Sequence, residues 1–231
     1  NDPDWSPLAE GAVLHAGDRL RTGATGRMAL EAADGPALRL DRDTQLDLSD
    51  PTRVALARGA LYVDSRDRAR ALVVETPRGE VTHLGTRYQL RLDGGDLRVA
   101  VRDGRVQVAA TRGRQSVGGG EMLRVPVAGE PERAALAPYG DDWAWVEAVA
   151  PTPSLDGLSL DALLGWVAHE TGRRIRYETD GAARAAQATM LHGSIAGLAP
   201  LQALEAVVAT TRLDYRIIAD QIVLSDAGTA P

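Results

Sequence analysis

The hydrophobic period of the sequence changes once, and this change limits the possible folds more than any other feature. Between residues 11 and 127, apolar and polar residues alternate, and glycines interrupt the alternation at short intervals, which is typical of many short strands. After residue 156 the apolar residues recur with the period of a helix. We therefore expect an α+β chain whose amino-terminal part is all-β in two packed layers, either a sandwich or a β-roll.

Three segments follow from these two periods. An all-β domain is expected at residues 8–127 and a small α+β module at residues 156–226, which suits a chain of 231 residues. Residues 128–155 are rich in proline and keep neither period, so they are predicted to be a linker. Trp143 and Trp145 lie within it. Because aromatic side chains are mostly buried, we expect these two to pin the linker onto one of the domains.

The module is predicted to carry two helices on one face of a small sheet. The first helix is expected at residues 160–172, with Ser159 as its amino-terminal cap and Gly172 in the left-handed position past its end. Pro200 indicates the first turn of the second helix. Strands are expected at residues 173–179, 190–195, 213–218 and 222–224.

The charge of the chain argues against nucleic acid as its main partner. The formal net charge is −6 and the acidic residues are dispersed, so no broad basic face for a phosphate backbone is evident. Cysteine is absent, which rules out disulfides and thiolate metal sites. No apolar run approaches the length that spans a bilayer, so we expect any membrane anchor to lie outside this chain.

Residues 17–30, GDRLRTGATGRMAL, have the composition of a phosphate-binding loop. Such a loop needs a particular glycine spacing, a lysine that reaches the phosphate and a helix that leaves the loop. Here the spacing and the lysine are missing, and a strand pattern follows. We therefore interpret residues 23–26 as a bend between two strands, where glycine supplies dihedral angles that other residues resist.

No group of residues in the sequence predicts catalysis, a metal or a cofactor, so we expect a protein that is not an enzyme. Serine never occurs in a GxSxG motif. Asp41, Asp43 and Asp47 lack the glycine and the closing glutamate of a calcium loop, so we expect solvated faces of a strand pair. The histidines form no close ligand pair and are expected to be surface or boundary residues: His15, His83, His169 and His192.

The all-β part resembles the FecR domain. The resemblance begins at GDRLRTGATGRMALEAADGPALRLDRDTQLDL, where a glycine-led turn and an RTG-like segment lead into paired strands. It continues through LARGALYVDS, LVVETPRGEVTHLGTRYQLRL, DLRVAVRDGRVQVAA and GGGEMLRV. Tyr88 stands where phenylalanine is usual in that family. The other matching positions are Gly59 and Ala60 before a strand, Thr76 and Pro77 after the next, and Gly85 and Thr86 before the aromatic residue.

The carboxyl-terminal part is similar to the STN module, which is found at the amino ends of secretins and TonB-dependent transducers and at the carboxyl ends of FecR-type regulators. Residues 160–172, 191–204 and 213–215 carry this resemblance. Together the two resemblances imply the periplasmic part of a transmembrane anti-sigma factor, which regulates an extracytoplasmic-function sigma factor. The cytoplasmic segment that holds the sigma factor and the membrane helix are absent from this chain.

The implied partner is the signalling domain of a TonB-dependent outer-membrane transducer that takes up an iron chelate or another nutrient. Small sheets with an open edge can accept a strand from a partner. The candidate edges are residues 189–195 and 213–218. The predicted partner-binding residues are Leu191, His192, Ser194, Ile195, Tyr215, Arg216, Ile217 and Ile218.

A periplasmic scaffold is the alternative interpretation. In it the β domain binds carbohydrate or the cell wall and has no anti-sigma activity, since a fold does not fix a function. An enzyme with a cleft in the β domain is the least favoured interpretation.

Overall fold

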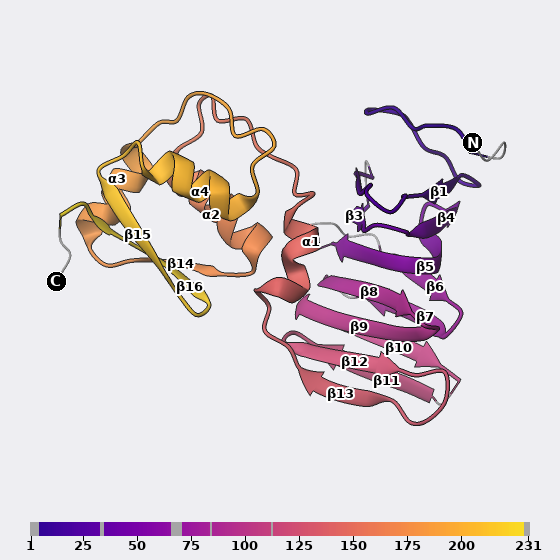
Figure 1. Ribbon diagram of the computed structural model, residues 1–231. Helices are drawn as coiled ribbons and strands as arrows, with labels where there is room; N and C mark the ends of the chain where they lie inside the picture. The colour runs from indigo at the N-terminus through magenta and orange to yellow at the C-terminus, as the bar shows by residue number, and fades with distance from the viewer. Residues whose placement is uncertain (1–4, 33–34, 66–70, 84, 112, 229–231) are drawn as a thin grey trace.

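The structure is a computed structural model (Figure 1) that describes residues 5–32, 35–65, 71–83, 85–111 and 113–228. A large sheet forms the amino-terminal part, and a small sheet with helices forms the carboxyl-terminal part, which confirms the predicted fold class. We refer to residues 5–136 as the sheet region and to residues 155–228 as the C-terminal region. Within the described residues, no helix combines the length and the apolar character that crossing a membrane requires.

The strands of the sheet region are short apart from β5. They are β1 (Arg19–Arg21), β2 (Met28–Leu30), β3 (Ala37–Leu40), β4 (Gln45–Asp50), β5 (Arg53–Asp64), β6 (Val73–Thr76), β7 (Gly79–His83), β8 (Arg87–Asp93), β9 (Asp96–Asp103), β10 (Arg105–Ala110), β11 (Gly113–Gly118), β12 (Glu121–Val125) and β13 (Glu132–Ala135).

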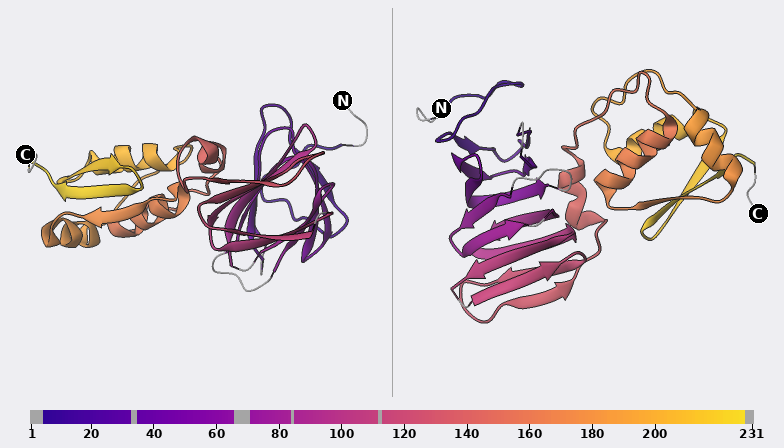
Figure 2. Two further views of the ribbon diagram at one scale, coloured as in Figure 1. Left: turned by 90° about the horizontal axis from the view of Figure 1, so that it is seen from below. Right: turned by 180° about the vertical axis from the view of Figure 1, so that it is seen from behind.

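These strands form two layers that share β5. The first half of β5 pairs with β4 and β6, and the second half pairs with β3 and β8. One layer therefore runs β1-β4-β5-β6-β7-β10-β11, and the other, which we call the second layer, runs β2-β3-β5-β8-β9-β12-β13. Figure 2 shows the two layers facing each other. One apolar cluster, which includes Leu40, Leu56, Tyr88 and Val99, fills the space between them.

Gly59 lies where β5 passes from one layer to the other. Its φ is 84°, and a Cβ atom there would lie 2.3 Å from Oγ1 and 2.5 Å from Cα of Thr44. The same Oγ1 accepts a hydrogen bond from the backbone N–H of Ala60 at 3.0 Å. The bend of β5 therefore needs a residue without a side chain, both for its backbone angle and for the close approach of Thr44.

The phosphate-loop-like stretch also connects the two layers. β1 pairs with β4 in one layer, and β2 pairs with β3 in the other, so the chain between them crosses the end of the sandwich. The backbone N–H of Thr22 donates to Thr44 O at 2.9 Å, and the N–H of Asp43 donates to Gly23 O at 3.2 Å. A strand follows the bend, so the predicted turn between two strands is confirmed.

The C-terminal region contains the helices α2 (Leu160–Thr171), α3 (Asp180–Ala188) and α4 (Pro200–Val208), and the strands β14 (Arg174–Tyr177), β15 (Leu213–Ile218) and β16 (Gln221–Asp226). The predicted caps of the first helix are confirmed: Oγ of Ser159 accepts from Ala162 N at 3.2 Å, and Gly172 is left-handed with φ 68°. The sheet order is β14-β16-β15, and apolar residues of its strands and of the helices form a second core.

Two local predictions for this region were wrong. Helix α3 was not expected, because its buried side consists of alanines, Ala182 and Ala186, which give no apolar stripe in the sequence. Residues 190–195 were expected to form a strand, but Met190 makes only an isolated bridge to Ser159 and the rest is irregular. Leu191 and Ile195 are instead buried in the second core.

The segment between the two regions packs on the outer face of the second layer. Its short helices η1 (Asp141–Trp143) and α1 (Ala144–Glu147) carry Trp143 and Trp145, which are both buried. They form a third apolar cluster with Ala60, Tyr62 and Ala100 of the sheet. The prediction that the two tryptophans pin this segment onto a domain is therefore confirmed. Strand β13, within the segment predicted as a linker, extends the second layer.

Candidate functional site

The carboxyl-terminal end of α2 meets the outer face of the second layer. Arg39 on β3 donates from Nη1 to Oε2 of Glu170 at 2.7 Å and from Nη2 to Oε1 at 2.9 Å. The Nη1 atom also donates to the carbonyl oxygen of Val146 in α1 at 3.0 Å. Both side chains of the pair are buried, with 4% and 6% of their surface exposed. The pair is thus a bidentate ion pair shielded from solvent, the strongest type of charged hydrogen bond in proteins.

Two further arginines bind backbone carbonyls in the last turn of α2. Nη1 of Arg87 on β8 donates to the carbonyl of His169, and Nη1 of Arg102 on β9 donates to that of Glu170 at 2.7 Å. The last four carbonyls of a helix have no partner within the helix and carry its negative dipole end. The sheet therefore supplies the cations that cap this helix.

Acidic and aromatic side chains complete this cluster. The guanidinium carbon of Arg102 lies 4.4 Å from the ring centre of Trp143, and its Nη2 atom lies 3.6 Å from Oε1 of Glu147. Nε2 of His169 lies 2.6 Å from Oδ2 of Asp64 at the end of β5. We call the whole cluster the arginine–glutamate joint; it comprises Arg39, Asp64, Arg87, Arg102, Glu147, His169 and Glu170.

Burial and charge act in opposite directions on the groups of the joint. Burial alone would lower the pKa of Arg39, but the hydrogen bond and the charge of Glu170 outweigh it and raise that pKa. Burial lowers the pKa of Arg102, and burial also raises the pKa of Glu147. For Arg39, the interaction with its partner therefore outweighs the cost of leaving water, whereas for Arg102 and Glu147 the effect of burial on the pKa dominates.

The joint holds more donors than its acceptors can satisfy. Among the described residues, Nε of Arg87 and both Nε and Nη2 of Arg102 are buried without a hydrogen-bond partner. Each buried donor without an acceptor lowers the stability of the joint, because water would bind that donor if it were exposed. The joint is therefore specific in its geometry but is not optimised for stability.

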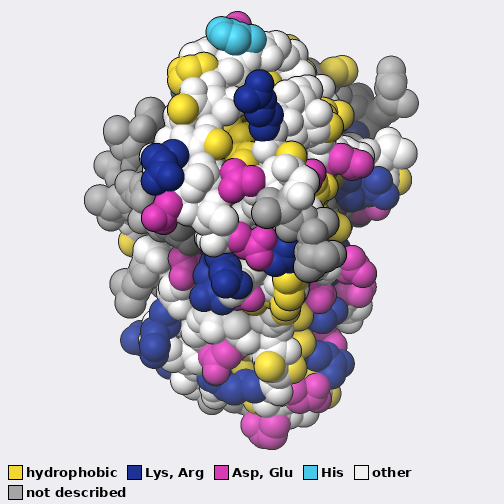
Figure 3. Space-filling model, turned by 90° about the vertical axis from the view of Figure 1, so that its left-hand side faces the viewer, with side chains coloured by type: hydrophobic (Ala, Val, Ile, Leu, Met, Phe, Trp, Pro, Cys, Tyr) yellow, Lys and Arg dark blue, Asp and Glu magenta, His cyan; other side chains and the backbone are white. Residues whose placement is uncertain are grey.

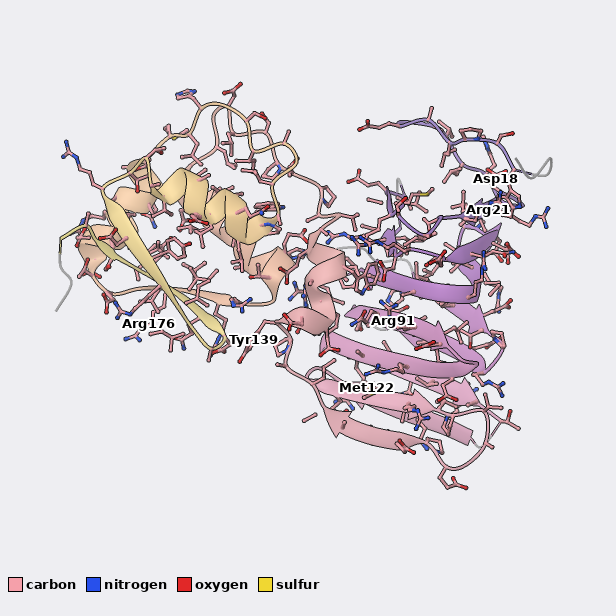
Figure 4. All side chains as sticks on the ribbon, viewed as in Figure 1. Asp18, Arg21, Arg91, Met122, Tyr139 and Arg176 are labelled. Carbon is pink, nitrogen blue, oxygen red and sulfur yellow. The ribbon has the colours of Figure 1, made fainter. Side chains whose placement is uncertain are left out.

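Gly172 brings the linker close to the end of α2. A Cβ atom at this position would lie 2.0 Å from the carbonyl oxygen of Pro138 and 3.0 Å from Nε of Arg102. Next to it, the guanidinium of Arg173 lies 4.8 Å from the ring centre of Tyr139, and Figure 4 labels Tyr139 in this part of the molecule. Gly172 thus ends the helix and also permits the close contact between the two parts of the chain.

The predicted partner-binding residues fall into two groups. Tyr215, Arg216, Ile217 and Ile218 lie on β15, which is an edge of the small sheet because it pairs only with β16 among the described strands. Ile217 and Ile218 are exposed by 39% and 52%. Of the other group, His192 and Ser194 are exposed but lie outside the sheet, and Leu191 and Ile195 are buried, as described above.

The surface of the C-terminal region shows charges of both signs. Arg216 on β15 forms an ion pair with Glu178, and Arg174 on β14 pairs with Asp220. Figure 3 shows arginine, acidic and apolar side chains interspersed on the face seen there, without a large area of one sign. Association through this region would therefore depend on shape and main-chain bonding more than on net charge.

Ser65 and His83 form a buried hydrogen-bonded pair of the type found in hydrolases, but with the opposite polarity. Nε2 of His83 accepts from the backbone N–H of Leu72 at 2.8 Å, so the proton of the neutral ring lies on Nδ1, 2.9 Å from the serine oxygen. Ser65 in turn donates to the carbonyl of Thr86 at 2.9 Å. Burial lowers the pKa of His83. The histidine is therefore a core residue and not the surface or boundary residue that was predicted, and it cannot accept the serine proton.

The aspartates considered for calcium have separate roles. Oδ1 of Asp41 accepts from Nε of Arg27 at 2.8 Å, and Oδ2 accepts from Nη2 of Arg91 at 2.7 Å. Asp41 is itself buried rather than solvated as predicted, whereas Asp43 is exposed at the turn before β4. Across the described ranges, no three histidine, aspartate or glutamate side chains come together as a metal-binding group.

Described residues of the sheet region line at least two hollows. One, of about 840 Å³, lies between the amino-terminal arm and the bend after β1, and Trp5, Arg19 and Arg21 are among its lining residues. The other, of about 220 Å³, lies beside the linker on the outer face, and Arg91 and Met122, both labelled in Figure 4, contribute to it. Neither contains a cluster of groups that would define a reaction.

Comparison with known proteins identifies the class of the sheet region. Residues 18–107 match the model of the family described as FecR protein, from the start of β1 into β10. Residues 18–107 therefore carry a match to the FecR family, and the resemblance seen in the sequence is confirmed over those residues. FecR-type proteins form a regulatory, non-enzymatic class.

Solved structures that match this chain include two of a candidate anti-sigma factor from Parabacteroides distasonis ATCC 8503. The first, at 1.65 Å resolution, is 15% identical with a TM-score of 0.49 and covers 91% of this chain and 100% of its own. The second, at 2.50 Å, is 14% identical with a TM-score of 0.47 and covers 91% and 99%. No curated protein matches the sequence.

The joint was missed by sequence reasoning, although one signal for it exists. Glu170 follows Leu163 by seven residues and Val167 by three, so it continues the buried stripe of α2 as a charged residue. A charge in such a stripe needs a partner, because an unpaired buried carboxylate is very costly. That partner, Arg39, lies 131 residues away in the sequence, so only the fold shows which residue it is.

Proposed function

We propose that this chain is the periplasmic signal-receiving part of a transmembrane anti-sigma factor. The observation that carries the proposal is the FecR match over residues 18–107. The regulated protein would be an extracytoplasmic-function sigma factor, held by a cytoplasmic segment outside this chain. The domain limits proposed from the sequence, residues 8–127 and 156–226 with a linker between them, divide the chain into a FecR domain and an STN-like module.

The proposed partner is the signalling domain of a TonB-dependent outer-membrane transducer in iron or other nutrient uptake. The C-terminal region supports this proposal with an edge strand, β15, whose outer side has no partner strand among the described residues. A strand from the transducer can extend the sheet there, so that main-chain hydrogen bonds give affinity and side-chain contacts give selectivity. The exposed Ile217 and Ile218 would contact the added strand.

Titration calorimetry of the chain with a purified transducer signalling domain tests this proposal. We expect binding at micromolar concentrations, as is usual for transient signalling contacts. The double variant Ile217→Glu, Ile218→Glu should weaken it at least about tenfold, because it places charge beside the added strand. Val127→Glu is the matched control, since Val127 is exposed by 55% but lies in the sheet region.

An absence of heat and of complex at tens of micromolar would refute the partner. Equal loss of affinity in the control variant would refute binding at the β15 edge, but it would not refute the transducer as the partner. The anti-sigma role is tested separately: the complete coding sequence should add one membrane helix and a small cytoplasmic segment that co-purifies with a sigma factor.

A further inference from the structure

The two regions of the chain are joined by polar contacts rather than by a shared apolar core. One apolar cluster of the described residues lies inside the sheet region, and another lies inside the C-terminal region. The third lies between the sheet and the linker, and it includes no residue of α2. The hydrogen bonds of the arginine–glutamate joint bind α2 to the sheet directly.

A polar contact of this kind can separate without exposing a hydrophobic core. Relative motion is the usual behaviour of domains whose interface is small and polar. When the joint opens, water can solvate Arg39 and Glu170 and can also satisfy the buried donors of Arg87 and Arg102 that lack acceptors here. The two regions can therefore stay folded both when the joint is formed, which we call the closed arrangement, and when it is separated, which we call the open arrangement.

We propose that the arginine–glutamate joint is a latch. It holds the C-terminal region against the sheet region in the closed arrangement seen here, and it opens as one unit while both apolar cores stay folded. The latch is a property of this chain and does not depend on which partner binds β15. In a signalling protein, such a latch would let an event at one region change the position of the other.

Glu170 is the central residue of the latch because it uses both its side chain and its backbone. Its carboxylate binds Arg39 and its carbonyl binds Arg102. Neutralising the carboxylate leaves Arg39 buried without a counter-charge, which favours the open arrangement. The ratio of open to closed molecules should then rise by roughly a hundredfold or more.

Distance measurement between spin labels on the full chain tests the latch. The natural sequence has no cysteine, so Ala57→Cys on β5 and Ala206→Cys on α4, both exposed positions, take labels only where intended. The otherwise unchanged chain should give one narrow distance distribution. Glu170→Gln and Arg39→Met should each give a broad distribution with longer distances, while the amide spectra of both cores stay as in the parent.

Matched controls separate the latch from a general loss of charge. Glu205→Gln removes an exposed carboxylate of α4, and Arg98→Met removes an exposed arginine of β9, the strand that carries Arg102. Both should keep the narrow distribution. An unchanged distribution in Glu170→Gln and Arg39→Met would overturn the latch, and so would loss of the core spectra in both variants, since the joint would then belong to the folded core.

Discussion

Gly59 and Gly94 both have positive φ, 84° and 57°, but their surroundings differ. A Cβ atom at Gly59 would collide with Thr44, whereas at Gly94 no atom lies within 4 Å. The backbone strain of an alanine in this conformation is shared by both positions, at roughly 1–2 kcal/mol. Only a Cβ atom at Gly59 would also collide with Thr44, and Gly59 lies at the bend where β5 passes from one layer to the other.

Gly59→Ala should therefore lower the free energy of unfolding more than Gly94→Ala does. The expected excess is about 1–3 kcal/mol, the usual cost of overpacking a well-filled position. Urea unfolding of both variants under the same conditions measures the difference. Equal losses would mean that β5 can bend elsewhere.

Asp41 gives the fold a defined response to acid. Burial, the largest single influence, would raise its pKa, but hydrogen bonds from Arg27 and Arg91 together outweigh burial and lower it. A carboxyl whose pKa is lower in the folded state stabilises the protein above the ordinary aspartate value of about 4. That stabilisation is lost as the pH falls through the lower folded-state value.

Asp41→Asn should accordingly destabilise the protein near neutral pH, and the deficit should shrink on acidification to about pH 3. Urea unfolding at both pH values shows this directly. Asp43→Asn is the control, because Asp43 is exposed two residues away; its effect should be small at both values. A deficit of Asp41→Asn that grows in acid would contradict the argument.

At the scale of elements, the sequence predicted those parts whose pattern is local. The alternation of the strands, the caps of α2 and the bend at residues 23–26 all depend on neighbours in the chain, and all were predicted. Helix α3 was missed because alanine carries helix propensity without an apolar stripe. The joint was missed for a different reason, since the pairing of Arg39 with Glu170 depends on how two distant elements pack.

The packing of the linker on the sheet depends on Trp143, and a single substitution can test it. Trp143 contacts Tyr62 edge-on with ring centres 6.4 Å apart, and its Nε1 donates to the carbonyl of Ala137 at 2.9 Å. Trp143→Ala should remove about 3–5 kcal/mol of local stability, the usual effect of deleting a buried tryptophan. The sheet core should remain, because it is a separate cluster.

Amide hydrogen exchange measures, residue by residue, the local stability that Trp143→Ala removes. Amides of residues 141–148 should exchange much faster in Trp143→Ala, with little change in β8 and β9. Trp5→Ala is the control: Trp5 is only partly buried and contacts Arg19 and Arg21 at the other end of the chain. Equal exchange in the two variants would show that Trp143 does not hold the linker.

At the scale of the whole molecule, the two proposals concern different surfaces. The edge strand β15 belongs to the small sheet, and the arginine–glutamate joint lies at the end of α2. One variant can therefore lose partner binding at β15 while the joint stays closed. Another can open the joint while partner binding is unchanged. Calorimetry with Glu170→Gln and label distances with Ile217→Glu, Ile218→Glu would show whether the two are energetically coupled.

The sharing of β5 also has a consequence for how the chain folds. The strands that pair with β5 are β3, β4, β6 and β8, all between residues 37 and 93, so both layers can start from contacts that are close in the sequence. Proteins with such contacts fold faster than sandwiches whose layers are built from distant segments. Since β5 belongs to both layers, we expect that neither layer forms without the other and that refolding of the sheet region follows a single exponential.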